Sequence, residues 1–141
     1  MSKKVHILYG DDDEMMRQVI GGQMSKHGYE VIYASDGNEV RDMARRLKPD
    51  VILLDYRMPV FDGLTTAKYL KSEEITKEIP VILLTNEDIS VEGQQMWGEH
   101  GFDAYIHKST DIPVFFAKIE EVLKKYGIEI PEPQKPGGPK E

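Results

Sequence analysis

The sequence predicts an α/β protein with a doubly wound sheet of five parallel strands and helices on both faces of the sheet. Short apolar runs alternate with longer stretches whose apolar residues recur at spacings of three and four, and this alternation is typical of β–α units. The runs Val51–Leu54 and Val81–Leu84 are uniformly apolar, as expected of central strands that helices cover on both sides. A chain of 141 residues with 40% hydrophobic residues is sufficient for one domain with a buried core.

We expect the strands at five apolar runs: Val5–Tyr9, Tyr29–Ala34, Val51–Leu54, Val81–Leu84 and Ala104–His107. The first run ends abruptly at Gly10 and three aspartates, and the turn-like segment Ser35–Gly37 follows the second. The fifth run is the weakest strand pattern of the set.

Helical periodicity is present within residues 16–24, 40–47, 64–70 and 115–126. Pro49 ends the second of these patterns, while Asp111 and Gly127 are expected to cap and to end the last one.

Glycines weaken two helical segments. Gly21–Gly22 lies within the first pattern, at a cost of up to about 1 kcal/mol per glycine relative to alanine, and the sequence offers no reason for the pair. Gly93 and Gly98 interrupt residues 88–101, which is therefore the least regular segment between two strands.

One domain is expected over residues 1–127. Residues 128–141 continue as a segment rich in Pro, Gly and Lys, a composition typical of a disordered tail. The tail can be interpreted as the stub of a linker in a longer protein or as a natural end.

The composition excludes several classes of function. A net charge of -7 argues against binding nucleic acid or an anionic membrane through a basic surface. The absence of cysteine excludes disulfides, thiolate metal sites and cysteine nucleophiles. No apolar run has the length of a signal peptide or the roughly 20 residues of a membrane span, so we expect a cytoplasmic protein.

Polar side chains are expected to gather at one edge of the sheet, since the carboxyl ends of parallel strands form the ligand site of doubly wound folds. Asp11–Asp13 follows the first strand, Asp55 the third, Thr85 the fourth and Lys108 the fifth. Carboxylates held close together repel one another until a proton or a cation intervenes. Mg²⁺ is typically held by one or two carboxylates with water and phosphate oxygens, which fits this set.

Each of these residues also has a structural interpretation. An aspartate after a strand often caps a helix, which suits Asp13, while Thr85 alone could pack or cap and Lys108 alone could be a solvated lysine. Asp55 differs, because four apolar residues precede it and an unpaired carboxylate there would be costly. A functional role is therefore predicted for Asp55.

From about Val5 to Tyr126 the chain resembles the receiver domains of two-component signalling, in particular single-domain, chemotaxis-type regulators. The matching segments are Ile7–Asp12, Asp50–Pro59, Phe61–Gly63, Pro80–Thr85 and Tyr105–Lys108. The most specific one places Asp55, Met58–Pro59 and Asp62–Gly63 in register. The resemblance implies a flavodoxin-like fold with the strand order 2-1-3-4-5.

The resemblance also implies a switch that is operated by phosphorylation. Asp55 would accept the phosphoryl group from a phosphohistidine of a sensor histidine kinase or a phosphotransfer protein. Asp11 and Asp12 would hold Mg²⁺ together with Asp55 and the backbone carbonyl of Arg57, and Lys108 would contact the phosphoryl oxygens. A carboxylate can serve as such a nucleophile, and phosphoryl transfer depends mainly on positioning and charge neutralisation.

In the same family pattern, Thr85 would move its hydroxyl onto the phosphate and Tyr105 would then turn inward. Tyr105 can equally be interpreted as an ordinary aromatic residue at a strand edge. The signal would pass to an effector protein through the fourth and fifth helices and the fifth strand, and dimerisation on phosphorylation stays open. The chain would catalyse only its own phosphorylation and slow dephosphorylation, so a conventional enzyme is not predicted.

Four residues near the expected site bear on rate and lifetime. Asn86 follows Thr85 where receivers usually have a small residue, and Ser109 follows the lysine where they usually have proline. Arg57 and Glu87 each lie two positions after a site residue. We predict that they form an ion pair over the pocket that slows the attack of water on the phosphoaspartate.

The sequence can be compared with three other functions. A phosphatase of the haloacid dehalogenase type needs a second acid at the position where this chain has Arg57. In a flavin-binding flavodoxin, Asp11–Asp13 would repel the phosphate of the bound flavin nucleotide. Both are disfavoured. A pseudo-receiver, which would act as an interaction module without phosphorylation, stays open because of Asn86 and Ser109.

Overall fold

The computed structural model describes residues 4–130. The strands of this part are β1 (His6–Gly10), β2 (Glu30–Ala34), β3 (Val51–Asp55), β4 (Val81–Thr85) and β5 (Ala104–His107), and its helices are α1 (Glu14–Lys26), α2 (Gly37–Leu47), α3 (Gly63–Ser72), α4 (Val91–Glu99) and α5 (Ile112–Lys125). The predicted α/β class is confirmed. Most of the tail expected from residue 128 onward lies outside the described residues. Within 4–130, none of the helices combines the length and the apolarity that crossing a bilayer requires.

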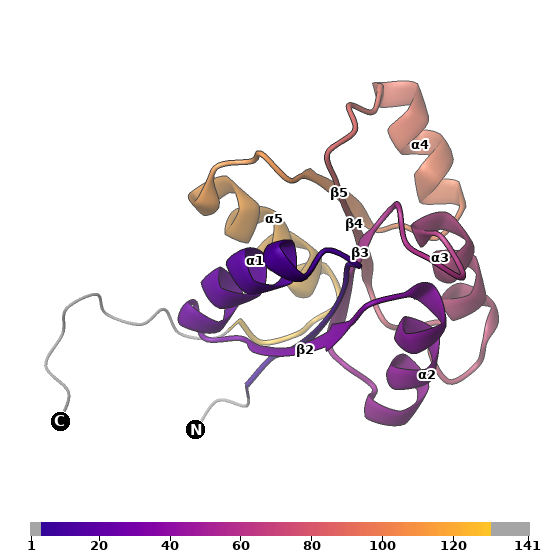
Figure 1. Cartoon of the computed structure of the whole chain (residues 1–141), viewed down its shortest axis with the longest axis horizontal. Helices are drawn as coiled ribbons and strands as arrows, with labels where there is room; N and C mark the ends of the chain where they lie inside the picture. Colours follow the sequence, from indigo (N-terminus) through magenta and orange to yellow (C-terminus); the bar gives the residue numbers. More distant parts are fainter. Residues whose placement is uncertain (1–3, 131–141) are drawn as a thin grey trace, which may run out of the picture.

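All strands are parallel and their order is β2-β1-β3-β4-β5, as the resemblance implied. The chain winds first to one edge of the sheet and then to the other, so α1 and α5 cover one face while α2, α3 and α4 lie on the opposite side (Figure 1). The direction reverses between β1 and β3. Their carboxyl ends lie side by side, with Gly10 of β1 opposite Leu54 of β3.

The core has two layers, one on each face of the sheet. Alternate residues of the central strands enter different layers: Leu53 and Leu84 pack toward α1 and α5, whereas Leu54 and Leu83 pack toward α2 and α3. Every residue of β3 and β4 is buried. This double burial explains why both strands read as continuous apolar runs.

Three strands extend one residue further than the apolar runs suggested, because backbone pairing continues through Gly10, Asp55 and Thr85. Asp55 and Thr85 are therefore the last residues of their strands rather than the first residues of the loops. Their backbones are held by the sheet while their side chains reach its edge.

The helix ends follow the predicted chemistry with one exception. The Asp13 carboxylate accepts hydrogen bonds from the amides of Met15 and Met16 and caps α1. Asp111 occupies the N-cap position of α5, but its side chain makes no capping hydrogen bond, so the predicted cap is wrong in that respect. α4 forms despite its poor pattern, and the Ser90 hydroxyl caps it by accepting a hydrogen bond from an amide of its first turn.

The pair Gly21–Gly22 has a partial explanation in the packing of α1 on β2. A Cβ atom on Gly21 would lie 2.0 Å from the hydroxyl oxygen of Tyr33, whereas one on Gly22 would meet no atom within 4 Å. Gly21 therefore makes room for an aromatic ring, and nothing in the structure explains Gly22.

Candidate functional site

Three carboxylates meet where β1 and β3 end. Asp11 and Asp12 directly follow β1, and Asp55 closes β3. One oxygen atom of each carboxylate lies within 4.8 Å of the other two. Asp11 is fully buried and Asp55 is 9% exposed, whereas Asp12 is exposed. The cluster is thus closed toward the protein and open to solvent on the side of Asp12.

Lys108 supplies the positive charge of the site. Its Nζ lies 2.8 Å from Oδ2 of Asp11 and 3.5 Å from Oδ1 of Asp55, and its side chain is only 6% exposed. The backbone amide of Lys108 donates to the carbonyl of Thr85 at 2.8 Å, so the loop after β5 is tied to the end of β4. Buried charges need such pairing and hydrogen bonding, and here the partners of Lys108 come from the ends of β1, β3 and β4.

Asp11 is held by contacts that the sequence did not reveal. The Tyr9 hydroxyl donates to Oδ2 of Asp11 at 2.7 Å, and the amide of Asp13 donates to Oδ1 at 2.9 Å. Arg17, on the first turns of α1, donates to the Asp11 carbonyl at 2.5 Å. Tyr9 reads as an apolar strand residue, and the one available signal is its i, i+2 spacing from Asp11, which directs both side chains to the same side.

The electrostatics of Asp55 reflect the crowding of like charges. Burial, and then the neighbouring Asp11, raise the pKa of the Asp55 carboxyl to about 6, although Lys108 acts in the opposite direction. Three carboxylates face one ammonium group. The oxygen donors, their proximity and the excess negative charge fit a hard divalent cation such as Mg²⁺.

Arg57 and Glu87 lie in contact at the edge of the site. The Nη2 atom of Arg57 is 2.6 Å from Oε2 of Glu87, a charge contact without the alignment of a hydrogen bond. The two side chains are 77% and 39% exposed. The ion pair therefore connects the loop after β3 with the loop after β4, and its effect on hydrolysis stays a prediction.

Glu87 also links the two residues of the expected switch. Its backbone amide donates to the hydroxyl of buried Thr85 at 3.2 Å, and its carbonyl accepts from the hydroxyl of half-buried Tyr105 at 2.6 Å. Asn86 is exposed. Ser109 is exposed as well, and its amide donates to Nδ1 of His107 at 3.1 Å.

The fold and this arrangement of acids, lysine and threonine define a class of signalling domain. Residues 7–120 match the model of the response regulator receiver domain family, and the chain belongs to this family. It is a receiver domain of two-component signalling.

Individual relatives carry names of regulatory proteins. The chain is 33% identical over 123 residues to the polar-differentiation response regulator DivK of Brucella ovis, and the match covers 87% of this chain and 98% of DivK. It is 34% identical over 122 residues to the uncharacterized transcriptional regulatory protein YvcP of Bacillus subtilis. That match covers 86% of this chain and 50% of YvcP, so the chain spans half the length of that relative.

Solved structures agree with the fold. The chemotaxis protein CheY4 of Vibrio cholerae superposes with a TM-score of 0.79 at 29% identity, over 86% of this chain and 100% of CheY4.

Proposed function

We propose that the protein is a phosphorylation-dependent switch in which Asp55 takes a phosphoryl group from a phosphohistidine of a sensor histidine kinase or phosphotransfer protein. The observation that carries the proposal is the position of Asp55. Its carboxylate ends a buried strand, lies beside Asp11 and Asp12, and has the Lys108 ammonium 3.5 Å away. The site is open to solvent on the side where Asp12 is exposed.

The reaction fits the groups present. A carboxylate oxygen of Asp55 attacks phosphorus, the bond from phosphorus to the histidine nitrogen breaks, and an aspartyl phosphate forms. Asp11, Asp12, Asp55 and the backbone carbonyl of Arg57 would hold Mg²⁺. When bound, Mg²⁺ would neutralise the negative charge that develops on the phosphoryl oxygens.

Lys108 and Thr85 respond to the new dianion. Lys108 lies between Asp11 and Asp55, so a small movement brings its ammonium group onto a phosphoryl oxygen. The Thr85 hydroxyl now accepts from the amide of Glu87 and has its proton free to donate to the phosphate. Its movement would release the loop that holds Tyr105, which is how a local charge biases a two-state element.

Phosphorylation would change the affinity of the protein for an effector protein that binds over α4, β5 and α5. We expect this interaction to take place in the cytoplasm. The second candidate is a pseudo-receiver that binds its partner without phosphorylation, and the exposed Asn86 and Ser109 beside the site favour it. The two candidates differ in whether a phosphoryl adduct forms.

Intact-protein mass spectrometry separates them. The protein is incubated with Mg²⁺ and acetyl phosphate, with D55N as the matched control. A gain of one phosphoryl group that needs Mg²⁺ and is absent from D55N supports the switch. No adduct under any condition, together with no binding of Mg²⁺ by calorimetry, would favour the interaction module instead.

A further inference from the structure

The helix α4 is the least firmly attached element of the described fold. None of its nine residues is buried, and Val91 and Met96 expose 73% and 53% of their surface. Gly93 and Gly98 lie inside it, and both lower its intrinsic helical stability. A helix this short depends on packing against the rest of the protein, so its few contacts decide its position.

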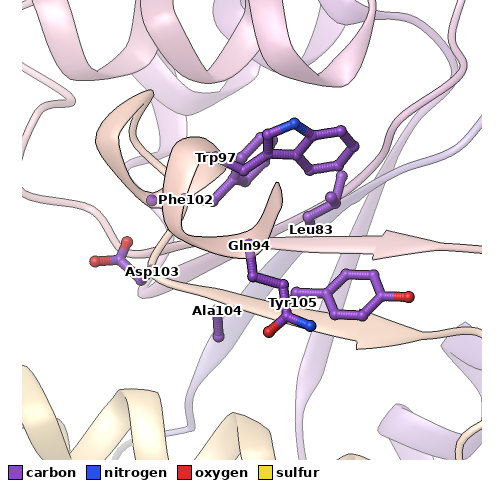
Figure 2. A pocket seen from close by; sticks show the side chains of 8 residues that line it. Leu83, Gln94, Trp97, Phe102, Asp103, Ala104 and Tyr105 are labelled. Carbon is purple, nitrogen blue, oxygen red and sulfur yellow. The ribbon is translucent and has the colours of Figure 1, made fainter. Parts of the chain in front are cut away.

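The main contact of α4 is the side chain of Trp97. Its ring stacks on Tyr56, with ring centroids 5.1 Å apart and an interplanar angle of 20°, and it lies against Phe102 at 6.0 Å. Beneath the helix is a cavity of about 190 Å³, which Trp97 lines together with Leu83 and Tyr105. Figure 2 shows the indole at the upper side of this cavity, above Leu83 and away from the Tyr105 ring. The space beside the indole leaves α4 room to shift.

The stacking partner of Trp97 is bonded directly to the phosphoacceptor. Tyr56 follows Asp55 in the chain, and its carbonyl accepts a hydrogen bond from the amide of Gly63 at 2.7 Å. Gly63 in turn packs so closely on this turn that a Cβ atom would lie 2.6 Å from the Asp55 carbonyl oxygen. The backbone of Tyr56 is therefore fixed to the strand end, and its ring lies directly against the indole.

We infer that the Tyr56–Trp97 stack couples the state of Asp55 to the position of α4, separately from the route through Thr85 and Tyr105. Tyr56 is a positioning residue in this scheme and takes no part in the chemistry. Where the inference concerns phosphorylation of Asp55, it rests on the proposed function. A coupling of this kind should also respond when D55N removes the charge of Asp55, so it can be tested without phosphorylation.

The first experiment is a double-mutant cycle read by hydrogen exchange of the amides of α4. D55N should change their exchange rates by about threefold or more in the wild-type background and leave them unchanged in a Y56L background. F102L is the matched control, because it removes the other ring from Trp97 without touching the turn after Asp55. Exchange should be faster in F102L, yet the response to D55N should persist. An equal response to D55N in the Y56L and wild-type backgrounds would overturn the coupling.

The second experiment records the fluorescence emission of Trp97, the one tryptophan of the chain, with Mg²⁺ and beryllofluoride. Mass spectrometry of protein incubated with acetyl phosphate records the phosphoryl adduct. The emission should change in the wild type. Y56L should still form the adduct, but the hydrogen exchange of its α4 amides should no longer respond to phosphorylation. An unchanged emission in phosphorylated wild-type protein would contradict the inference. A missing adduct would refute the proposed function, and the D55N cycle would still decide the coupling.

Discussion

At the residue scale, the site is a balance between crowded acids and one buried lysine. Asp11 is satisfied by Tyr9, by the Asp13 amide and by Lys108. Asp55 has the longer contact to Lys108, at 3.5 Å, and its raised pKa shows that the folded protein disfavours its charge. This unsatisfied charge makes Asp55 the group with most to gain from a cation or a phosphoryl group.

The first prediction concerns pH and stability without divalent cations. The pKa of Asp55 rises from 3.8 to about 6 on folding, so the folded state binds more protons between these values and the free energy of unfolding falls as pH rises through this window. D55N removes the penalty and should be more stable than the wild type by about 2–3 kcal/mol at pH 7. Urea unfolding should show the difference shrinking toward pH 4. A difference that does not depend on pH would contradict the assignment.

The second prediction concerns the lifetime of the aspartyl phosphate. If the Arg57–Glu87 pair restricts water, R57A/E87A should shorten the lifetime by about threefold, since an exposed pair contributes up to roughly 1 kcal/mol. The decay of the phosphorylated mass measures it. R46A/D42A removes an exposed ion pair on α2, 3.2 Å long, and should leave the lifetime unchanged. Equal lifetimes in all three proteins would refute the role of the pair.

At the element scale, a helix is anchored in proportion to the apolar face it can bury. α5 buries residues on successive turns, whereas α4 buries none of its residues. The same reasoning explains why segment 88–101 gave the poorest helical pattern: the pattern records burial, and α4 is helical with little of it. Its position depends on Trp97, a contact between side chains far apart in sequence.

The third prediction uses the two glycines of α1. G22A should raise the free energy of unfolding by up to about 1 kcal/mol, because alanine favours the helix and its Cβ meets no atom within 4 Å. G21A should destabilise the protein, because its Cβ would lie 2.0 Å from the Tyr33 hydroxyl. Chemical denaturation of both variants measures the contrast, and a G21A protein as stable as G22A would show that Tyr33 moves aside freely.

At the scale of the whole molecule, the acidic site joins strand ends that are distant in sequence. Asp11 and Asp12 follow β1, Asp55 ends β3, and Lys108 follows β5. A cation held by this set binds only the assembled sheet, so its binding free energy adds to the stability of the fold.

The fourth prediction follows from this linkage. Mg²⁺ at 100 times its dissociation constant should raise the free energy of unfolding of the wild type by about 2.7 kcal/mol. D12N should lose most of this gain, and because Asp12 is exposed the variant should fold normally. D42N, which alters an exposed aspartate of α2, should keep the gain. Thermal unfolding with and without Mg²⁺ measures it, and equal gains in D12N and D42N would place the cation elsewhere.

The sequence by itself determined the alternation of strands and helices, the buried central strands and the residues at the strand ends. These features follow from periodicity and from the rule that the carboxyl ends of parallel strands meet at one edge of the sheet. They were sufficient to predict that Asp11, Asp55 and Lys108 lie close together. Only the tertiary structure decided the contact of Tyr9 with Asp11 and the stacking of Trp97 on Tyr56. Such contacts depend on distances and angles between packed elements, and periodicity along a chain carries no information about them.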